Sequence, residues 1–406
     1  MPAAIFVAPY FLEATLRFVE AVSNLEDVRL GLVSTDPEDR LPPAIRSQLA
    51  AHWRVSDCLD PVQTEQAVRG LATRLGRPDV LLGTLEELQV PLAEVRERTG
   101  IPGLGVEAAK NFRDKARMKS VLAAAGLPCA RHRLAADPEA AFAFAREVGY
   151  PVVVKPQAGA GARNTFRVDS DDRLRAYVAE IPPSSERPVM LEEFVTGEEH
   201  SFDAVVIDGR AVWHSISRYY PSPLEVLREP WIQWCVLLPR HVDGPEYEAI
   251  RREGPASLAA LGLRTGLAHM EWFRRPDGSV AISEVGARPP GAQFTTLMSY
   301  AHDTDMYRAW ARLMVYGTFD PPARRYAVGC AYLRGQGTGR VRAVHGLADA
   351  AREVGDLVIE SRLPRPGQSP SGSYEGDGYA ILRHPETAVV EEGLLRLVSR
   401  MRVELG

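Results

Sequence analysis

Two glutamates in neighbouring predicted strands carry the most specific chemical signal of the sequence. Glu271 lies in the apolar segment 268–273 and Glu284 in the apolar segment 280–285. The Pro-Asp-Gly turn at 276–278 predicts that these strands run antiparallel. Counted inward from this turn, the glutamates lie at similar depths, so we expect both to face one side. Carboxylates side by side repel each other unless a cation lies between them. Oxygen ligands that act together with a phosphate suit Mg²⁺ or Mn²⁺.

An arginine follows the second glutamate closely. Arg288 lies four residues after Glu284, in the stretch EVGARPPGA. A guanidinium beside a metal-bound phosphate can stabilise an oxyanion or an acyl phosphate. The sequence leaves open the alternative that Arg288 only forms a structural salt bridge with Glu284.

A lysine directly follows the three valines at 152–154. A charged lysine at the end of a buried strand is costly unless it meets an anion, and Lys155 lies at such a position. Gly159, Ala160 and Gly161 follow, and backbone N–H groups of such a loop can close over phosphate oxygens. Many strand–turn–strand hairpins end in the same way, so these features alone do not decide between the two interpretations.

An acidic segment offers a third set of polar groups. Glu192, Glu193, Phe194 and Val195 form a predicted extended segment, and Glu199 follows it. Extended backbone can present C=O and N–H groups to the edge of an adenine, and a nearby carboxylate can accept hydrogen bonds from ribose hydroxyls. The alternative is a solvated acidic loop.

The elements that must position these residues follow from periodicity. Residues 3–8 and 28–33 read as strands around a helix at 11–23, which favours a parallel sheet. A further strand is predicted at 79–83 and a helix near 85–99. No GxGxxG occurs in the first turn, which argues against dinucleotide binding.

The rest of the chain also alternates between helices and strands. Helices are predicted at 107–126, 138–148, 245–261 and 303–316, and strands at 188–195 and 201–207, joined by TGEEH. Residues 319–325 read as a linker, and 326–406 as a smaller α/β tail. The fold class is therefore α/β. The predicted domains are 1–108, 109–320 and 321–406.

Composition excludes several classes of protein. Of 406 residues, 45% are hydrophobic and 25% charged, as in soluble globular proteins. The net charge of −5 gives no general attraction to nucleic acid or anionic membranes. The four cysteines form no CxxC, and no signal peptide or membrane-length apolar stretch is visible. We expect a cytoplasmic protein without a nucleic-acid or membrane partner.

Taken in order, these motifs resemble the ATP-grasp superfamily. The resemblance covers about residues 110–320. The stretches KNFRDKARMKSVLAAAGLP, VVVKP, EEFVTGEE and ISEVGARPPG are most similar to the bacterial L-amino-acid (dipeptide) ligases. It implies an ATP-grasp fold with an N-terminal open α/β domain, a two-part ATP-grasp module whose lid spans about 150–195, and a small C-terminal α/β domain.

The resemblance also implies a role for each motif. Lys115 and Lys155 match lysines that reach the ATP phosphates, and Gly159, Ala160 and Gly161 match the loop over them. Glu192, Glu193, Phe194 and Val195 match the adenine hinge, read by the carbonyl of Glu193 and the N–H of Val195, and Glu199 matches the ribose carboxylate. Glu271 and Glu284 match the metal ligands. Arg288, with Lys155, matches the catalytic cations.

One position departs from the pattern of the superfamily. Many members have asparagine two residues after the second glutamate, whereas this chain has Gly286. A glycine cannot bind a metal through a side chain. Either water completes the metal shell or a second metal is held more loosely, and a small residue there also occurs in some amino-acid ligases.

The implied activity is ATP-dependent ligation of a carboxylate to an amine. An acyl phosphate forms first, the amine then displaces phosphate, and ADP is the other product. The expected cofactors are ATP and Mg²⁺ or Mn²⁺. The expected partners are small carboxylate and amine substrates, with amino acids favoured, and a homodimer is expected for the superfamily. The alternatives are an enzyme activating bicarbonate or formate, as in biotin-carboxylase-like or purine-synthesis enzymes, and an ATP-binding module without turnover.

The lysine count adds one observation. The sequence has 48 lysines and arginines, of which only Lys110, Lys115, Lys119 and Lys155 are lysines. Codon bias explains the low count, but not why all four lie within 110–155. Lys115 and Lys155 fall where the resemblance requires a compact ammonium against phosphate, which arginine's planar fork replaces poorly. No function is assigned to Lys110 or Lys119.

Several further residues stay open between core and substrate pocket. His269 could orient an acyl phosphate. Tyr219, Tyr220, Trp231 and Trp234 could line the pocket, and Arg218 and Arg228 could hold a substrate carboxylate.

Overall fold

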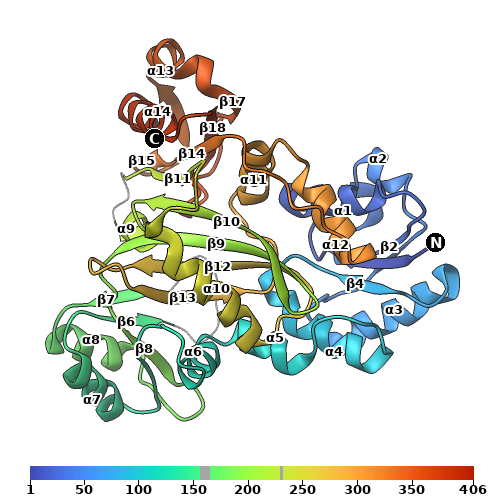
Figure 1. The fold of residues 1–406 in the computed structure, drawn as a ribbon, viewed down its shortest axis with the longest axis horizontal. Coiled ribbons are helices and arrows are strands. Elements are labelled where there is room, and N and C mark those ends of the chain that lie inside the picture. The colour runs from blue at the N-terminus through green and yellow to red at the C-terminus, as the bar shows by residue number, and fades with distance from the viewer. Residues whose placement is uncertain (156–164, 229–231) are drawn as a thin grey trace.

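The computed structural model describes residues 1–155, 165–228 and 232–406. Its N-terminal part is a parallel sheet with the strand order β3-β2-β1-β4 (Figure 1). The strands are β1 (Ala3–Val7), β2 (Arg29–Ser34), β3 (Ala51–Arg54) and β4 (Val80–Leu82), and the helices are α1 (Glu13–Ser23), α2 (Pro43–Arg46), α3 (Pro61–Leu75) and α4 (Gln89–Thr99). All five residues of β1 are buried, as expected for a parallel strand covered on both faces. The predicted β-α-β beginning is confirmed.

The predicted helix at 107–126 is two helices. α5 (Val106–Arg113) ends at Asp114, and α6 (Lys115–Ala124) begins directly after it. The Asp114 carboxylate accepts hydrogen bonds from the backbone N–H groups of Ala116 and Arg117, at 3.0 and 3.1 Å. An aspartate in this N-cap position stabilises a new helix start. The single-helix prediction is therefore wrong, and the break places Lys115 in the first turn of α6.

A small antiparallel sheet stands apart from the rest, at the lower left of Figure 1. Its order is β5-β8-β6-β7. The strands are β5 (His132–Ala135), β6 (Val152–Lys155), β7 (Phe166–Val168) and β8 (Val189–Glu193). The helices α7 (Pro138–Val148) and α8 (Asp171–Glu180) contribute Phe144 and Leu174 to one core with this sheet. Of these elements, β6, β7, α8 and β8 lie within the predicted lid at about 150–195, whereas β5 and α7 precede it.

An eight-stranded antiparallel sheet forms the centre of the molecule, with the order β13-β12-β9-β10-β11-β14-β18-β17. Its strands are β9 (Glu198–Ile207), β10 (Arg210–Tyr220), β11 (Trp234–Leu238), β12 (Gly266–Arg274), β13 (Val280–Gly286), β14 (Ala327–Leu333), β17 (Val358–Arg362) and β18 (Gly378–His384). Two predictions change here. Glu198, Glu199 and His200 belong to β9 rather than to a connection. Strands after residue 326 extend the central sheet, although the predicted domain boundaries themselves stay predictions.

Helices cover both faces of the central sheet. On one face, α6 and α10 (Glu248–Leu261) pack against Phe202 and Trp272. On the other face, α11 (Phe294–His302), which the sequence analysis did not predict, and α12 (Met306–Tyr316) join β10, β11 and the N-terminal part in one core. The remaining elements are α9 (Pro223–Arg228), α13 (Leu347–Val354), α14 (Thr387–Arg400), β15 (Gly335–Gln336), β16 (Val341–His345) and β19 (Arg402–Leu405). None of the helices in the described ranges is long and apolar enough to cross a membrane.

Two buried histidines predict how stability depends on pH. His200 stacks on Trp272 with ring centroids 4.5 Å apart, and His302 packs beside Trp213. Burial lowers the pKa of each histidine to about 4. In the unfolded chain the pKa returns to about 6.5, so below that pH the unfolded state binds more protons. The stabilisation is complete above about pH 6.5 and is lost as the pH falls toward 4, at up to about 3 kcal/mol per histidine.

Urea unfolding between pH 7.5 and 5 measures this effect. We expect the unfolding midpoint to fall with pH in the wild type and to fall less in the double variant His200→Gln/His302→Gln. His241→Gln, at an exposed position, is the control and should follow the wild type. Equal slopes in the wild type and the double variant would contradict the assignment.

Candidate active site

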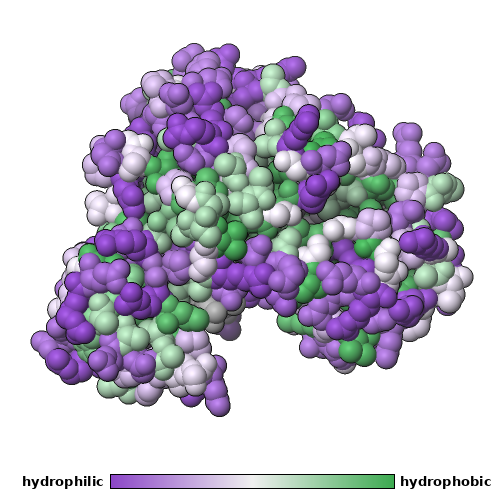
Figure 2. All heavy atoms as spheres, turned by 60° about the horizontal axis from the view of Figure 1, so that its bottom comes forward, coloured by the Kyte–Doolittle hydropathy of each residue, from purple (hydrophilic) through white to green (hydrophobic). Residues whose placement is uncertain are grey.

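One cavity of about 790 Å³ brings together all the predicted site residues that the structure describes. The cavity is lined by the lid sheet, the central sheet, the segment after β4 and a C-terminal segment. The predicted residues that line it are Lys115, Lys155, Glu192, Glu193, Phe194, Val195, Glu199, Glu271, Glu284 and Arg288. Gly159, Ala160 and Gly161 lie outside the described residues. In the space-filling view a notch separates the lobe at the lower left from the lobe at the lower right (Figure 2).

The two predicted metal ligands face each other across β12 and β13. Glu271 is the direct pairing partner of Glu284, whereas Trp272 pairs with Ile282. Ser283 is therefore an extra residue, a β-bulge, between the two pairs. In an unbroken register Glu271 would pair with Ser283, and Glu284 would point to the opposite face. The bulge turns Glu284 toward Glu271 and into the cavity.

A polar network continues from Glu271 across the cavity-facing side of the sheet. Glu271 pairs with Ser201 of β9, and His269 pairs with Asp203. His269 Nδ1 lies 2.6 Å from the Asp203 carboxylate, and its Nε2 lies 3.9 Å from Glu271. Burial opposes the charged ring, but Asp203 outweighs it and raises the pKa of His269 to about 9. His269 is therefore a cation beside Glu271 at neutral pH.

Lys115 is the partner of the second glutamate. Its Nζ donates a hydrogen bond to Oε1 of Glu284. The charged form of Glu284 is disfavoured by burial, but Lys115 outweighs this and holds the pKa of the carboxyl below its usual value. Because Lys115 lies in the first turn of α6, the break at Asp114 is what aims it at β13.

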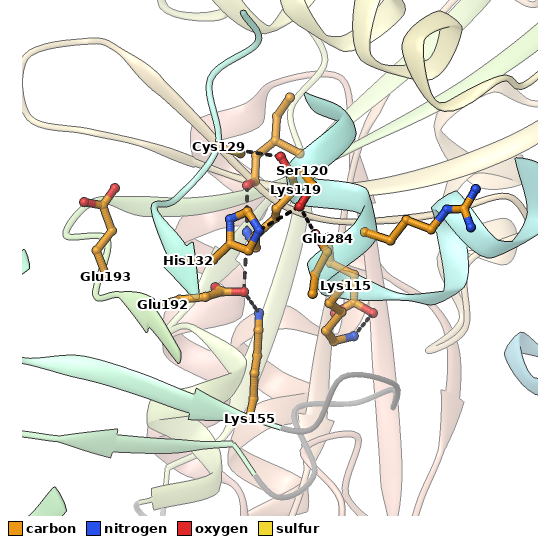
Figure 3. A network of polar contacts seen from close by, with 12 residues as sticks. Lys115, Lys119, Ser120, Cys129, His132, Lys155, Glu192, Glu193 and Glu284 are labelled. Atoms are coloured by element: carbon orange, nitrogen blue, oxygen red, sulfur yellow. Dashed lines mark hydrogen bonds and ion pairs between the residues drawn. The ribbon is translucent and has the colours of Figure 1, made fainter. Parts of the chain in front are cut away.

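Glu192 forms the centre of a buried cluster with two lysines (Figure 3). Its Oε1 lies 2.7 Å from Nζ of Lys155 and 3.5 Å from Nζ of Lys119. Burial works against all three charges. The lysines outweigh it for Glu192 and lower its pKa, and Glu192 outweighs it for Lys155 and raises that pKa, whereas burial lowers the pKa of Lys119.

Lys119 is a site residue that the sequence analysis did not assign. Its Nζ also donates to the carbonyl of Ile282 in β13, at 3.3 Å, and its side chain is fully buried. It therefore links the lid strand β8 to the strand that carries Glu284. The available signal was its spacing, because residues i and i+4 lie on the same helix face and Lys119 follows Lys115 by four.

Glu193 lies on the opposite side of β8 from Glu192, as strand alternation requires. Arg131 and Arg275 pair with its carboxylate at 2.6 and 3.0 Å. The guanidinium of Arg167 lies 4.5 Å from the centre of the Phe194 ring. These contacts anchor the predicted adenine hinge to the residue before β5, to β7 and to the β12–β13 turn.

Glu199 lies on β9 opposite Phe273, on the same side of the sheet as Glu271. Burial and the neighbouring Glu271 raise the pKa of Glu199 well above its usual value. At neutral pH this carboxyl therefore takes up a proton more readily than an exposed glutamate.

Arg288 is held by a residue from the N-terminal part of the chain. Its Nε donates to Oε2 of Glu86, and its Nη1 donates to the carbonyl of Pro289 at 2.8 Å. The proposed alternative of a direct Arg288–Glu284 salt bridge is not what the structure has, since Glu284 pairs with Lys115. Glu86 was missed in the sequence. Its available signal was its place after a parallel strand, where ligand sites of α/β sheets lie.

Aromatic side chains form a wall of the cavity beside Arg288. Tyr219, Trp234, Phe294 and Tyr374 all line it. Trp234 lies 5.4 Å from Tyr219 and 4.7 Å from Tyr374 between ring centres. The other candidates differ. Tyr220 and Arg218 do not line this cavity, and Arg218 donates to the hydroxyl of Tyr247. Trp231 and the Arg228 side chain lie outside the described part.

The donor set fits Mg²⁺ bound together with a nucleotide. Two facing carboxylates are available, and Mg²⁺ commonly takes one or two protein carboxylates, with phosphate oxygens and water completing its octahedron. Across residues 1–155, 165–228 and 232–406, no three His, Cys, Asp or Glu side chains lie in a metal-binding group. The facing pair Glu271 and Glu284 suits a metal whose remaining ligands are phosphate oxygens and water.

The sequence is similar to known ATP-grasp proteins. Residues 113–220 match the family described as phosphoribosylglycinamide synthetase, ATP-grasp (A) domain. An L-arginine-specific L-amino acid ligase of Bacillus subtilis is 24% identical over 276 residues, 66% of each chain. The carbamoyl phosphate synthase large chain of Streptomyces coelicolor is 28% identical over 276 residues, 65% of this chain and 23% of the relative. The matched part thus spans less than two thirds of either relative.

Solved structures share the fold over the whole chain. An L-amino acid ligase from Bacillus licheniformis has a TM-score of 0.77 at 19% identity, with 100% of this chain and 99% of that chain covered. N5-carboxyaminoimidazole ribonucleotide synthetase from Thermotoga maritima has a TM-score of 0.70 at 18% identity, with both chains fully covered. Residues 113–220 thus match an ATP-grasp domain, the whole chain shares its fold with these solved enzymes, and the chain resembles the L-amino-acid ligases.

Proposed function

We propose that this protein is an ATP-dependent ligase that joins a carboxylate to an amine through an acyl phosphate. The observation that carries the proposal is the facing pair Glu271 and Glu284, in one cavity with Lys115, Lys155 and Arg288. Two carboxylates, two ammonium groups and a guanidinium around one cavity are the groups needed to hold a nucleoside triphosphate with its metal. The similarity to the L-arginine-specific ligase supports the same activity class.

Each group has a defined task in this proposal. Glu271 and Glu284 hold Mg²⁺, or Mn²⁺ in its place, which neutralises phosphate charge when bound. Lys115 and Lys155 move from their carboxylates onto phosphate oxygens. The hinge Glu192–Val195 forms hydrogen bonds with the edge of the adenine, and Glu199 accepts hydrogen bonds from the ribose hydroxyls. The loop of Gly159, Ala160 and Gly161 covers the phosphates.

The chemistry consists of two displacements. The substrate carboxylate attacks the γ-phosphorus, and the bond to the ADP oxygen breaks. The amine then attacks the acyl carbon, loses a proton, and inorganic phosphate leaves as the amide forms. Arg288 stabilises the negative charge on the acyl oxygen.

The aromatic wall favours an amino-acid substrate over bicarbonate. Tyr219, Trp234, Phe294 and Tyr374 line the cavity, and of these Tyr374 is half-buried while the other three are buried behind the cavity surface. Bicarbonate has no apolar surface to bury there, whereas the side chain of an amino acid has. Bicarbonate is the second candidate acid, because the chain also shares its fold with a biotin carboxylase domain from Hydrogenobacter thermophilus whose structure contains MgADP and bicarbonate. We also propose that the enzyme works in the cytoplasm, which its four free cysteines support, and homodimer formation stays a prediction.

A substrate panel tests this function. ADP release is measured with each proteinogenic L-amino acid as the acid, and with hydroxylamine or a second amino acid as the amine. Mass spectrometry then identifies the hydroxamate or dipeptide. We expect ADP release that requires both partners. ADP release with bicarbonate alone would favour the second candidate, and tight ATP binding without turnover in any arm would favour a binding module.

The metal pair predicts a loss of both metal binding and turnover. In Glu284→Gln and Glu271→Gln we expect ADP formation to fall about 100-fold or more, since several kcal/mol of charge stabilisation are lost. Binding of Mn²⁺ in the presence of ADP, followed by electron paramagnetic resonance, should weaken in parallel. Glu392→Gln, in an exposed pair with Arg396 on α14, is the control. Unchanged Mn²⁺ binding in both variants would contradict the assignment.

The lysines predict a selective defect in ATP use. Lys115→Arg and Lys155→Arg keep the charge but replace a compact ammonium by a planar fork in a buried site. We expect KM for ATP to rise about tenfold or more, as charge-assisted hydrogen bonds to phosphate are misaligned. Lys110→Arg is a matched control, because Lys110 is exposed on α5 and pairs with Glu107. Normal kinetics in both buried variants would contradict the proposed role.

A further inference from the structure

The contact between Glu86 and Arg288 joins two parts of the chain that are 202 residues apart. Glu86 follows β4 of the N-terminal sheet, and Arg288 follows β13 of the central sheet. Both side chains are largely buried, with 8% and 18% of their surface exposed. Burial works against the Arg288 charge, but Glu86 outweighs it and raises the pKa of the guanidinium above its usual value. The guanidinium of Arg288 therefore keeps its charge beside Glu86.

Gly286 supplies the space for this contact. It ends β13 opposite His269, on the cavity side. A Cβ atom at this position would lie 3.2 Å from Oε2 of Glu86 and 3.6 Å from Cγ of Arg288. The first distance is shorter than ordinary van der Waals contact, so any side chain at 286 pushes the carboxylate aside. Gly286 therefore leaves free the space that the Glu86 carboxylate occupies.

The segment that carries Glu86 is packed against the core of the N-terminal part. Residues 86–88 form a 3₁₀ turn between β4 and α4. Leu88 is fully buried in the core of the N-terminal part, and the Gln89 side chain donates to the carbonyl of Leu85 at 3.0 Å. The packed turn fixes the backbone from which the Glu86 carboxylate reaches Arg288.

We propose that Glu86 is a positioning residue for Arg288, and that Gly286 is the gap that admits it. This inference rests on the proposed function, in which Arg288 stabilises the acyl oxygen. The Glu86 carboxylate accepts a hydrogen bond from Nε–H of Arg288, and the Pro289 carbonyl accepts one from its Nη1–H. The plane of the guanidinium is then fixed, and N–H groups on Nη2 keep one direction toward the reacting atoms. Preorganised donors of this kind require no reorganisation during the reaction.

The role of Glu86 is orientation rather than charge. A carboxylate beside Arg288 reduces the positive potential at the site, so a purely electrostatic argument predicts that its removal helps catalysis. Orientation predicts the reverse, because a displaced guanidinium no longer meets the reacting oxygen. A misplacement of about 1 Å can cost about 100-fold in rate. The two explanations therefore predict opposite signs for the change in kcat.

A double-mutant cycle tests the inference. The variants are Glu86→Ala, Gly286→Ala and the double variant, with Glu86→Gln as the conservative change that keeps size and a hydrogen-bond acceptor. Turnover is measured as ADP release with the best L-amino acid of the panel and hydroxylamine. Binding of ADP with Mg²⁺ is measured by calorimetry. Glu94→Ala, which breaks the exposed Glu94–Arg98 pair on α4, is the control.

We expect Glu86→Ala to lower kcat about 100-fold, while the KM for ATP and the affinity for ADP stay unchanged. Glu86→Gln should lower kcat by a smaller factor. Gly286→Ala should lower kcat in the wild-type background and add no further loss to Glu86→Ala, because the carboxylate it displaces is already gone. Unchanged or raised kcat in Glu86→Ala, or fully additive losses, would overturn the inference and leave the proposed function standing. A wild-type enzyme without ADP release would overturn the proposed function itself.

Discussion

A buried charge is costly unless hydrogen-bond partners or an opposite charge meet it, and in the active-site cavity opposite charges do so. Lys115 forms an ion pair with Glu284, and Arg288 forms one with Glu86. Lys155 and Lys119 both pair with Glu192. Each pair joins different elements, so neutralising the charges also holds the lid, the central sheet and the N-terminal part together. The same pairs keep the cations next to the place where phosphate would bind. In the proposed function, a bound nucleotide would replace one anionic partner of these cations by another, so that no unpaired charge would be buried.

The carboxylates carry the complementary half of this arrangement. Glu271 and Glu284 face each other, and Glu199 lies on the same side of the sheet. Lys115 offsets the charge of Glu284, and the His269–Asp203 pair places a second cation beside Glu271. A divalent metal suits the negative charge of the glutamates that these cations do not offset. Lysine and histidine thus offset the glutamate charges in this structure, and in the proposed function metal and nucleotide would take over this role.

Much of this site could be predicted because local patterns carry it. The Pro-Asp-Gly turn indicates the hairpin, and the valine run places Lys155 at the end of a strand. The order of the motifs indicates the ATP-grasp fold, which the comparisons bear out. The roles of the individual residues stay proposals. Other features depend on contacts that no local pattern shows. The N-cap at Asp114 splits one predicted helix into two, and strands from the C-terminal tail join the central sheet through pairing with β11.

The sequence by itself determined which chemical groups are present, in what order, and on which kind of element, because residue type and hydrophobic periodicity are local properties. Only the tertiary structure decided which groups meet. Simple alternation along β13 would put Glu284 on the face of Ile282, away from Glu271, and the bulge at Ser283 reverses this. The partners of Lys119 and Arg288 are set by the packing of α6 on β13 and of the β4 turn against Gly286. Strand register and long-range contact depend on the whole fold, since a shift of one residue turns every side chain to the other face.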